Sequence, residues 1–99
     1  MKAEAVKDLL KIETLKILML QETKIEGETL LHINRSKSKK NVGKAISARG
    51  TSGGLATLWS NEEFSLESSF ETQHSIYTKL RHIASNLALS LFNVYVHVL

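Results

Sequence analysis

The sequence predicts a mixed α/β (α+β) fold in a single small domain, residues 1–99. Three observations predict it: helical spacing of apolar residues near the start, a compact apolar run directly after it, and five short apolar segments separated by turn residues from position 42 onward. The helix and the apolar strand come first, and a mostly antiparallel β-meander follows. No internal repeat or linker composition divides the chain.

The first two elements are a helix and a strand. The stretch Ala3–Glu13 lacks proline and glycine and places Val6, Leu9 and Leu10 at helical spacing, which predicts a short amphipathic helix. The run ILML within Lys16–Gln21 is bounded by polar residues, as in a strand covered on both faces. This order indicates layers of helix and sheet.

The next stretch changes character at residue 35. Ile25–Asn34 has three apolar residues between positions 30 and 33, which favours a second short helix, although Gly27 near its start is a poor helix former. Arg35–Lys40 contains four basic residues and two serines, a composition typical of a solvated loop.

The remaining chain predicts five strands, which are Val42–Ala48, Gly54–Trp59, Phe64–Phe70, Ser75–Leu80 and Leu87–Val98. Gly50–Gly54 and Ser60–Glu63 have the composition of tight connections, so we expect neighbouring strands to form antiparallel hairpins. In the last strand, period-2 alternation separates two faces: Phe92, Val94, Val96 and Val98 on one, and Asn93, Tyr95 and His97 on the other.

Composition excludes several classes of site. The apolar content of 42% is too high for a disordered chain, and the absence of cysteine excludes disulfides, zinc thiolate sites and cysteine nucleophiles. The longest apolar runs fall far short of the roughly 20 residues that a membrane helix needs. Charged residues interrupt the N-terminus, so we expect no secretion signal and an intracellular location. The net charge of +3 is a mild bias toward polyanions.

Several motifs occur together in one order: ILMLQETK (Ile17–Lys24), GTSGGLATLW (Gly50–Trp59), LESSF (Leu66–Phe70), QHS (Gln73–Ser75) and FNVY (Phe92–Tyr95). In this order they resemble the endonuclease/exonuclease/phosphatase superfamily, and they are most similar to the plant-like endonuclease domains of LINE-type retrotransposons. The resemblance covers roughly the whole chain.

The resemblance implies a partial four-layer α/β sandwich and a magnesium-dependent DNA endonuclease, a hydrolase, with a nuclear location if the element is functional. It implies that Glu22 binds the metal, that Tyr95 lies near the scissile phosphate as a catalytic residue, and that Asn93 lines the same neighbourhood. Mg²⁺ prefers hard oxygen ligands, and a strand end holds a carboxylate rigidly. Gly53 and Gly54 are then structural.

The chain also departs from the family. The resemblance implies an earlier strand with a metal-site asparagine, and a later Asp/Asn pair and Ser-Asp-His segment, and the sequence contains none of them. Asp8 is the single aspartate and falls on the predicted opening helix. We therefore expect an internal fragment, truncated at both ends, without useful phosphodiesterase activity alone. The alternatives are a non-enzymatic relic with weak electrostatic nucleic-acid binding, or a fragment of another superfamily phosphatase.

The same residues also have ordinary structural interpretations. Without the resemblance, Glu22 is a polar residue at a strand end, Tyr95 is a half-buried strand residue and Asn93 satisfies backbone groups. The four histidines lack metal-ligand spacing and are expected to be structural or on the surface. GTSGG lacks the lysine of a phosphate-binding loop, and Trp59 is expected in the core.

Overall fold

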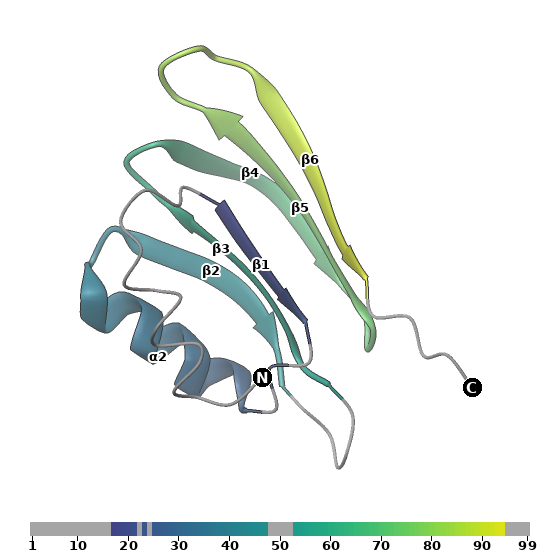
Figure 1. The fold of residues 1–99 in the computed structure, drawn as a ribbon. Helices are drawn as coiled ribbons and strands as arrows, with labels where there is room; N and C mark the ends of the chain where they lie inside the picture. Colours follow the sequence, from purple (N-terminus) through teal and green to yellow (C-terminus); the bar gives the residue numbers. More distant parts are fainter. Residues whose placement is uncertain (1–16, 22, 24, 48–52, 95–99) are drawn as a thin grey trace.

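The computed structural model describes residues 17–21, 23, 25–47 and 53–94, which form one helix and six strands (Figure 1). The elements are β1 (Ile17–Gln21), α2 (Gly27–Lys37), β2 (Asn41–Ile46), β3 (Leu55–Ser60), β4 (Phe64–Glu71), β5 (Ser75–His82) and β6 (Ala88–Val94). They make two antiparallel three-stranded sheets, with strand orders β1-β3-β2 and β4-β5-β6. The mixed α/β prediction is confirmed, while the helix predicted at Ala3–Glu13 lies outside the described residues.

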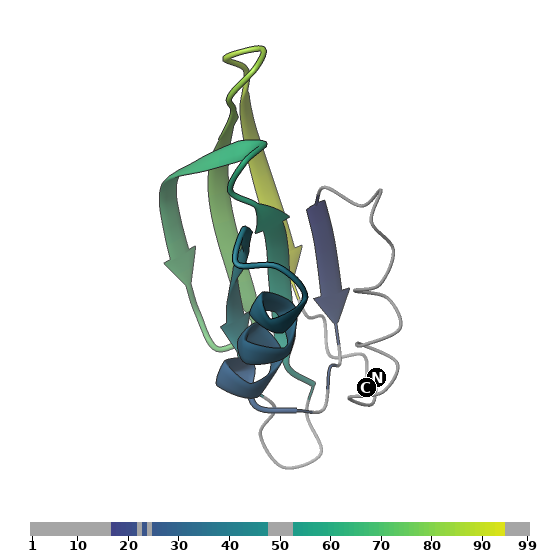
Figure 2. The ribbon, with the colours of Figure 1, turned by 90° about the vertical axis from the view of Figure 1, so that its left-hand side faces the viewer.

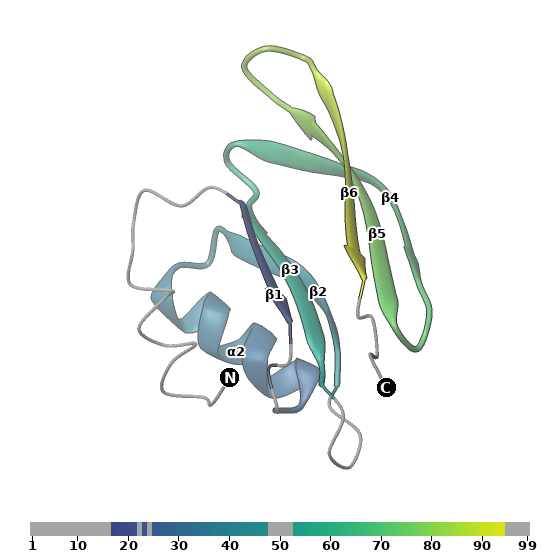
Figure 3. The same ribbon diagram turned by 45° about the vertical axis from the view of Figure 1, so that its right-hand side comes forward.

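The described elements stack in three layers (Figures 2 and 3). Helix α2 packs on one face of the first sheet through β2 and β3, and the second sheet faces the other side through contacts of β3 with β5 and β6. The first sheet is therefore the middle layer.

Strand β3 is central in the middle layer and carries both parts of the core. Because side chains alternate along a strand, Ala56 and Leu58 face α2, where they cluster with Leu20 and Leu30. Trp59 points the other way and packs between the sheets in a second cluster, with Phe64 and Leu80. All residues from Leu55 to Trp59 are buried, so the core position predicted for Trp59 is confirmed.

The strand predicted within Lys16–Gln21 is confirmed as β1. Leu18 packs against the cluster under α2, and Ile17 packs against the cluster between the sheets, so the strand contributes to both. Its cover is incomplete, because Met19 keeps 46% of its surface exposed.

The helix predicted within Ile25–Asn34 is confirmed, but it continues to Lys37. The loop predicted for Arg35–Lys40 is therefore wrong for its first three residues. Arg and Lys are good helix formers, and cations in the last turn interact favourably with the helix dipole. Leu30 and Asn34 are buried on the face of α2 that meets the sheet.

The predicted hairpins are confirmed within each sheet and wrong between β3 and β4. Ser60–Glu63 carries the chain from one sheet to the other instead of pairing the two strands. The physical reason lies on either side of this turn: Trp59 and Phe64 both enter the cluster between the sheets. Burying both side chains in this cluster requires β3 and β4 to lie in two sheets that face each other, rather than next to each other in one sheet.

At two positions the structure explains why the residue is glycine. At Gly43 an added Cβ would lie 2.6 Å from the carbonyl oxygen of Thr57 and 2.5 Å from Cδ2 of Leu58, so β2 and β3 approach more closely than a side chain permits. Gly54 has φ 86°, a left-handed conformation that costs glycine little. The structural role predicted for Gly54 is therefore confirmed.

Candidate functional site

Strands β1 and β6 run in the same direction and end at the same edge of the molecule (Figure 3). Gln21 is the last residue of β1, and Val94 is the last residue of β6. Glu22 and Tyr95, the predicted metal ligand and tyrosine, directly follow these two residues in the sequence and lie outside the described residues. The candidate site is therefore built from what surrounds the two strand ends.

Asn93 is buried at this edge, with 2% of its surface exposed. It belongs to β6 in the second sheet, yet its amide nitrogen reaches the first sheet. There it donates to the carbonyl oxygens of Ala56 at 2.9 Å and Leu20 at 3.2 Å, and lies 3.4 Å from Oγ1 of Thr57. One side chain thus joins β6 to both β1 and β3.

Gln21 completes the connection between the strand ends. Its Nε2 donates to the backbone carbonyl of Val94 at 2.8 Å and to Oδ1 of Asn93 at 3.3 Å. Both groups of the Asn93 carboxamide are then hydrogen-bonded, as a buried amide requires. Asn93 satisfies backbone groups, which is one of the two roles that the sequence left open for it, and its place beside a phosphate stays a prediction.

The chain beyond β1 is anchored to the start of β3. The backbone N–H of Thr23 donates to the carbonyl of Gly54 at 3.3 Å, and Thr23 is buried. The left-handed Gly54 therefore lies next to Thr23, the residue that follows Glu22 in the sequence. Thr23 belongs to the motif ILMLQETK and Gly54 to the motif GTSGGLATLW. These two motifs are therefore in contact through Thr23 and Gly54.

Three backbone carbonyl oxygens at this edge, which could otherwise be metal ligands, already accept hydrogen bonds. The carbonyls of Leu20 and Ala56 accept from Asn93, and the carbonyl of Val94 accepts from Gln21. Within the described ranges, no group of three or more histidine or acidic side chains is placed to hold a metal ion. The described surroundings thus position the strand ends and do not themselves form a coordination shell.

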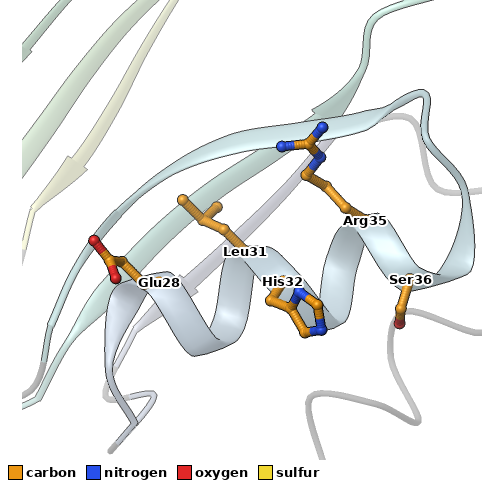
Figure 4. A pocket seen from close by; sticks show the side chains of 5 residues that line it. All are labelled: Glu28, Leu31, His32, Arg35 and Ser36. Atoms are coloured by element: carbon orange, nitrogen blue, oxygen red, sulfur yellow. The ribbon is translucent and has the colours of Figure 1, made fainter.

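A second feature is a hollow on the outer side of α2, lined by Glu28, Leu31, His32, Arg35 and Ser36 (Figure 4). Residues four apart on a helix share a side, and accordingly Leu31 and Arg35 project to one side of the helix while His32 and Ser36 project to the other. Acidic, basic and imidazole groups are therefore spread along the helix rather than converging on one point.

Sequence reasoning missed a Ser-His-Glu series at the tip of the β5–β6 hairpin. His82 Nδ1 lies 2.7 Å from Oγ of Ser85, and its Nε2 lies 3.5 Å from Oε2 of Glu63. The backbone N–H of Ser85 also donates to Nδ1 at 3.3 Å, and that of Leu87 donates to the Ser85 hydroxyl at 3.4 Å. These local bonds close the turn, which is the structural role expected for a histidine here. His82 and Ser85 are close in sequence, but Glu63 comes from the turn before β4, and no spacing rule connects it with them.

The sequence matches no protein-family model, and a search of curated proteins also gives no match. In the part of the chain that the structure describes, no helix has both the length and the hydrophobicity needed to cross a membrane.

Proposed function

We propose that the chain is an internal piece of a Mg²⁺-dependent DNA endonuclease domain of the LINE retrotransposon type, in the endonuclease/exonuclease/phosphatase superfamily. The observation that supports this proposal is the hydrogen bond from Gln21 to the carbonyl of Val94. Glu22 and Tyr95 are the residues that follow these two joined strand ends in the sequence, and consecutive Cα atoms are about 3.8 Å apart. The family needs its glutamate and tyrosine near one phosphate.

In this proposal, Glu22 is a magnesium ligand, Tyr95 contacts the scissile phosphate, and Asn93 with Gln21 fixes the distance between their strands. In a complete domain the metal polarises the phosphate. A single carboxylate binds Mg²⁺ weakly, and the neighbouring carbonyls of Leu20 and Ala56 are committed to Asn93. We therefore propose that this chain has no useful phosphodiesterase activity by itself.

The complete domain would be a four-layer sandwich with a nuclear location. The described order of helix, sheet and sheet is compatible with three of these layers. Support for a fourth comes from the outer face of the second sheet, where Phe70 and Phe92 are 66% and 67% exposed. Large exposed aromatic side chains on one face favour a covering element in the parent domain.

Paramagnetic NMR with Mn²⁺ in place of Mg²⁺ tests the site assignment. We expect millimolar Mn²⁺ to broaden the side-chain amide signals of Gln21 and Asn93 first, and Glu22→Gln to abolish this selectivity. Glu28→Gln removes an equal charge from α2 and serves as the control, because it should leave the broadening intact. Broadening elsewhere, or broadening insensitive to Glu22→Gln, would contradict the assignment.

A plasmid-nicking assay in Mg²⁺ tests the activity. We expect the purified chain to nick no faster than a Glu22→Ala variant, because the catalytic partners of the family are missing. Nicking that is abolished by Glu22→Ala would overturn the proposal that the chain is inactive.

A relic that binds nucleic acid electrostatically is the second candidate, and one observation favours it. Arg35, Lys37 and Lys39 are all exposed at the end of α2 and in the turn that follows. Clustered exposed cations attract phosphates without reading sequence.

A further inference from the structure

Strand β6 is an exposed edge strand of the second sheet (Figure 1). It pairs with β5 on one side; at the end of its second side the carbonyl of Val94 accepts from Nε2 of Gln21, and no described strand pairs with the rest. Its side chains are exposed as well: Leu89, Phe92 and Val94 keep 36%, 67% and 44% of their surfaces accessible. An edge of this kind offers a row of backbone N–H and C=O groups to another extended chain.

Charge distinguishes β6 from the opposite edge of the same sheet. Strand β4 contains Glu67 and Glu71, and its pairing with β5 is interrupted by a bulge between Leu66 and Ser68. Bulges and charges are the features that keep edges from pairing with other molecules. The sequence from Leu87 to Leu99 contains no Asp, Glu, Lys or Arg, so β6 has neither protection.

The edges of the first sheet are also less suited to pairing. Strand β2 places Lys44 near its middle, and β1 is five residues long. Two copies that met through β2 would bring their lysines close together, whereas two copies of β6 meet without like-charge repulsion.

We propose that β6 pairs antiparallel with β6 of a second copy, so that the two β4-β5-β6 sheets join into one six-stranded sheet. Backbone groups at strand spacing select an extended strand, and a two-fold axis makes one edge its own complement. The proposal goes beyond the nuclease function and does not depend on it.

Pairing centred on Leu91, the middle residue of β6, places the two-fold axis there and leaves the Val94 carbonyl of each copy with Gln21. Phe92 then lies opposite Ser90 of the other copy and diagonal to its Phe92, within reach of an aromatic contact. A row of aromatic residues already crosses the sheet, since Phe70 pairs with Tyr77 and Tyr77 with Phe92, whose rings are 4.8 Å apart. Pairing through β6 continues this row into the second copy.

Analytical ultracentrifugation over a concentration series tests the proposal with the full chain and two matched variants. Phe92→Lys places a charge on β6, and Phe70→Lys places the same charge on β4, in the same row and at nearly equal exposure. We expect the unmodified chain to form dimers, Phe92→Lys to weaken dimerisation about tenfold or more, and Phe70→Lys to leave it unchanged. Circular dichroism establishes that both variants fold.

The outcomes separate edge pairing from other modes of association. Equal weakening by both variants would overturn the proposal, because it indicates stacking through the outer face. A monomer at all concentrations, or open-ended fibres, would overturn it too. Hydrogen exchange of the unmodified chain gives a second measurement that needs no variant. The amides of β6 that do not bond to β5 should become more protected as the concentration rises, and protection independent of concentration would contradict the pairing.

Discussion

Asn93 is a polar residue in a core position, and its energetic role follows from its partners. It donates a hydrogen bond to each of two carbonyl groups of the opposite sheet and accepts one from Gln21. Each intramolecular hydrogen bond of this kind stabilises the folded chain by about 0.5–1.5 kcal/mol. The side chain therefore holds the two sheets together where neighbouring strands contribute apolar contacts.

Replacing Asn93 tests this role. We expect Asn93→Ala to lower the free energy of unfolding by about 3 kcal/mol, and Asn93→Asp to lower it further, because a carboxylate would face the carbonyls of Leu20 and Ala56 without a donor. Urea denaturation measures both. Asn61→Ala, at an exposed turn residue, is the control and should change stability by less than about 0.5 kcal/mol. An Asn93→Asp variant as stable as the unmodified chain would disprove the donor role.

A second prediction at the residue scale concerns Gly43. An added methyl group would collide with a backbone carbonyl that cannot move without disturbing β3, so Gly43→Ala should lower the free energy of unfolding by about 2 kcal/mol. Gly27→Ala is the comparison, because its new Cβ would lie 3.1 Å from the Cβ of Ala45 and alanine favours the helix. Thermal melting should show the smaller loss for Gly27→Ala, and the reverse order would contradict the close approach at Gly43.

At the scale of elements, the sequence predicted a helix or a strand correctly where the apolar periodicity and the length of a segment both indicate the same element. The ILML run, the apolar residues near Leu30 and the five later segments each correspond to a described element, while Ala48 and residues 95–98 of the predicted strands lie outside the described residues. Sheet membership was not predictable in the same way. Whether Ser60–Glu63 makes a hairpin or crosses between sheets depends on Trp59 and Phe64 sharing one cluster, a tertiary contact with no local signal.

The candidate site shows the same division. The motifs named Asn93 from a resemblance, but its bonds to Leu20 and Ala56 join residues more than thirty positions apart, and no spacing rule predicts them. Gln21 was read as part of a motif, yet its bond to Val94 links the ends of two strands. Long-range hydrogen bonds between sheets appear once the sheets are packed.

The inner face of β5 gives a prediction at this scale. Thr78 is completely buried, and its hydroxyl has no hydrogen-bond partner in the structure described. Thr78→Val keeps the shape and removes the polar atom, so the free energy of unfolding should rise by about 1 kcal/mol. Thr57→Val is the matched control, because that buried hydroxyl lies 3.4 Å from the Asn93 amide, and it should bring no gain. Urea denaturation compares the two, and a loss at Thr78 would reveal a partner for its hydroxyl.

At the scale of the whole molecule, charge is distributed unevenly around the layers. Arg35, Lys37 and Lys39 are exposed together at one end of α2, whereas Lys40 pairs with Glu62 and the second sheet neutralises Arg81 with Glu67. The exposed segment is thus the part of the described surface best suited to contact phosphates.

This distribution predicts weak, salt-dependent binding to duplex DNA. We expect a Kd on the order of 10⁻⁴ M at physiological salt, and a slope of log K against log salt near −0.9 for each phosphate contacted. Replacing the three exposed cations with glutamate should flatten this slope, while Lys79→Glu on the second sheet should not. Fluorescence anisotropy over a salt series measures the effect, and equal slopes for all variants would exclude the segment as the binding surface.

The position of β1 has a consequence for the order of folding. Strand β3 receives β2 through a short connection on one side and β1, from much earlier in the chain, on the other. Closing the longer loop costs more entropy, so we expect β1 to dock after the β2–β3 and β4–β5–β6 hairpins have formed. Gln21 then meets Asn93 in the last step, and molecules that have not completed that step carry no assembled site, however native the rest of their sheets.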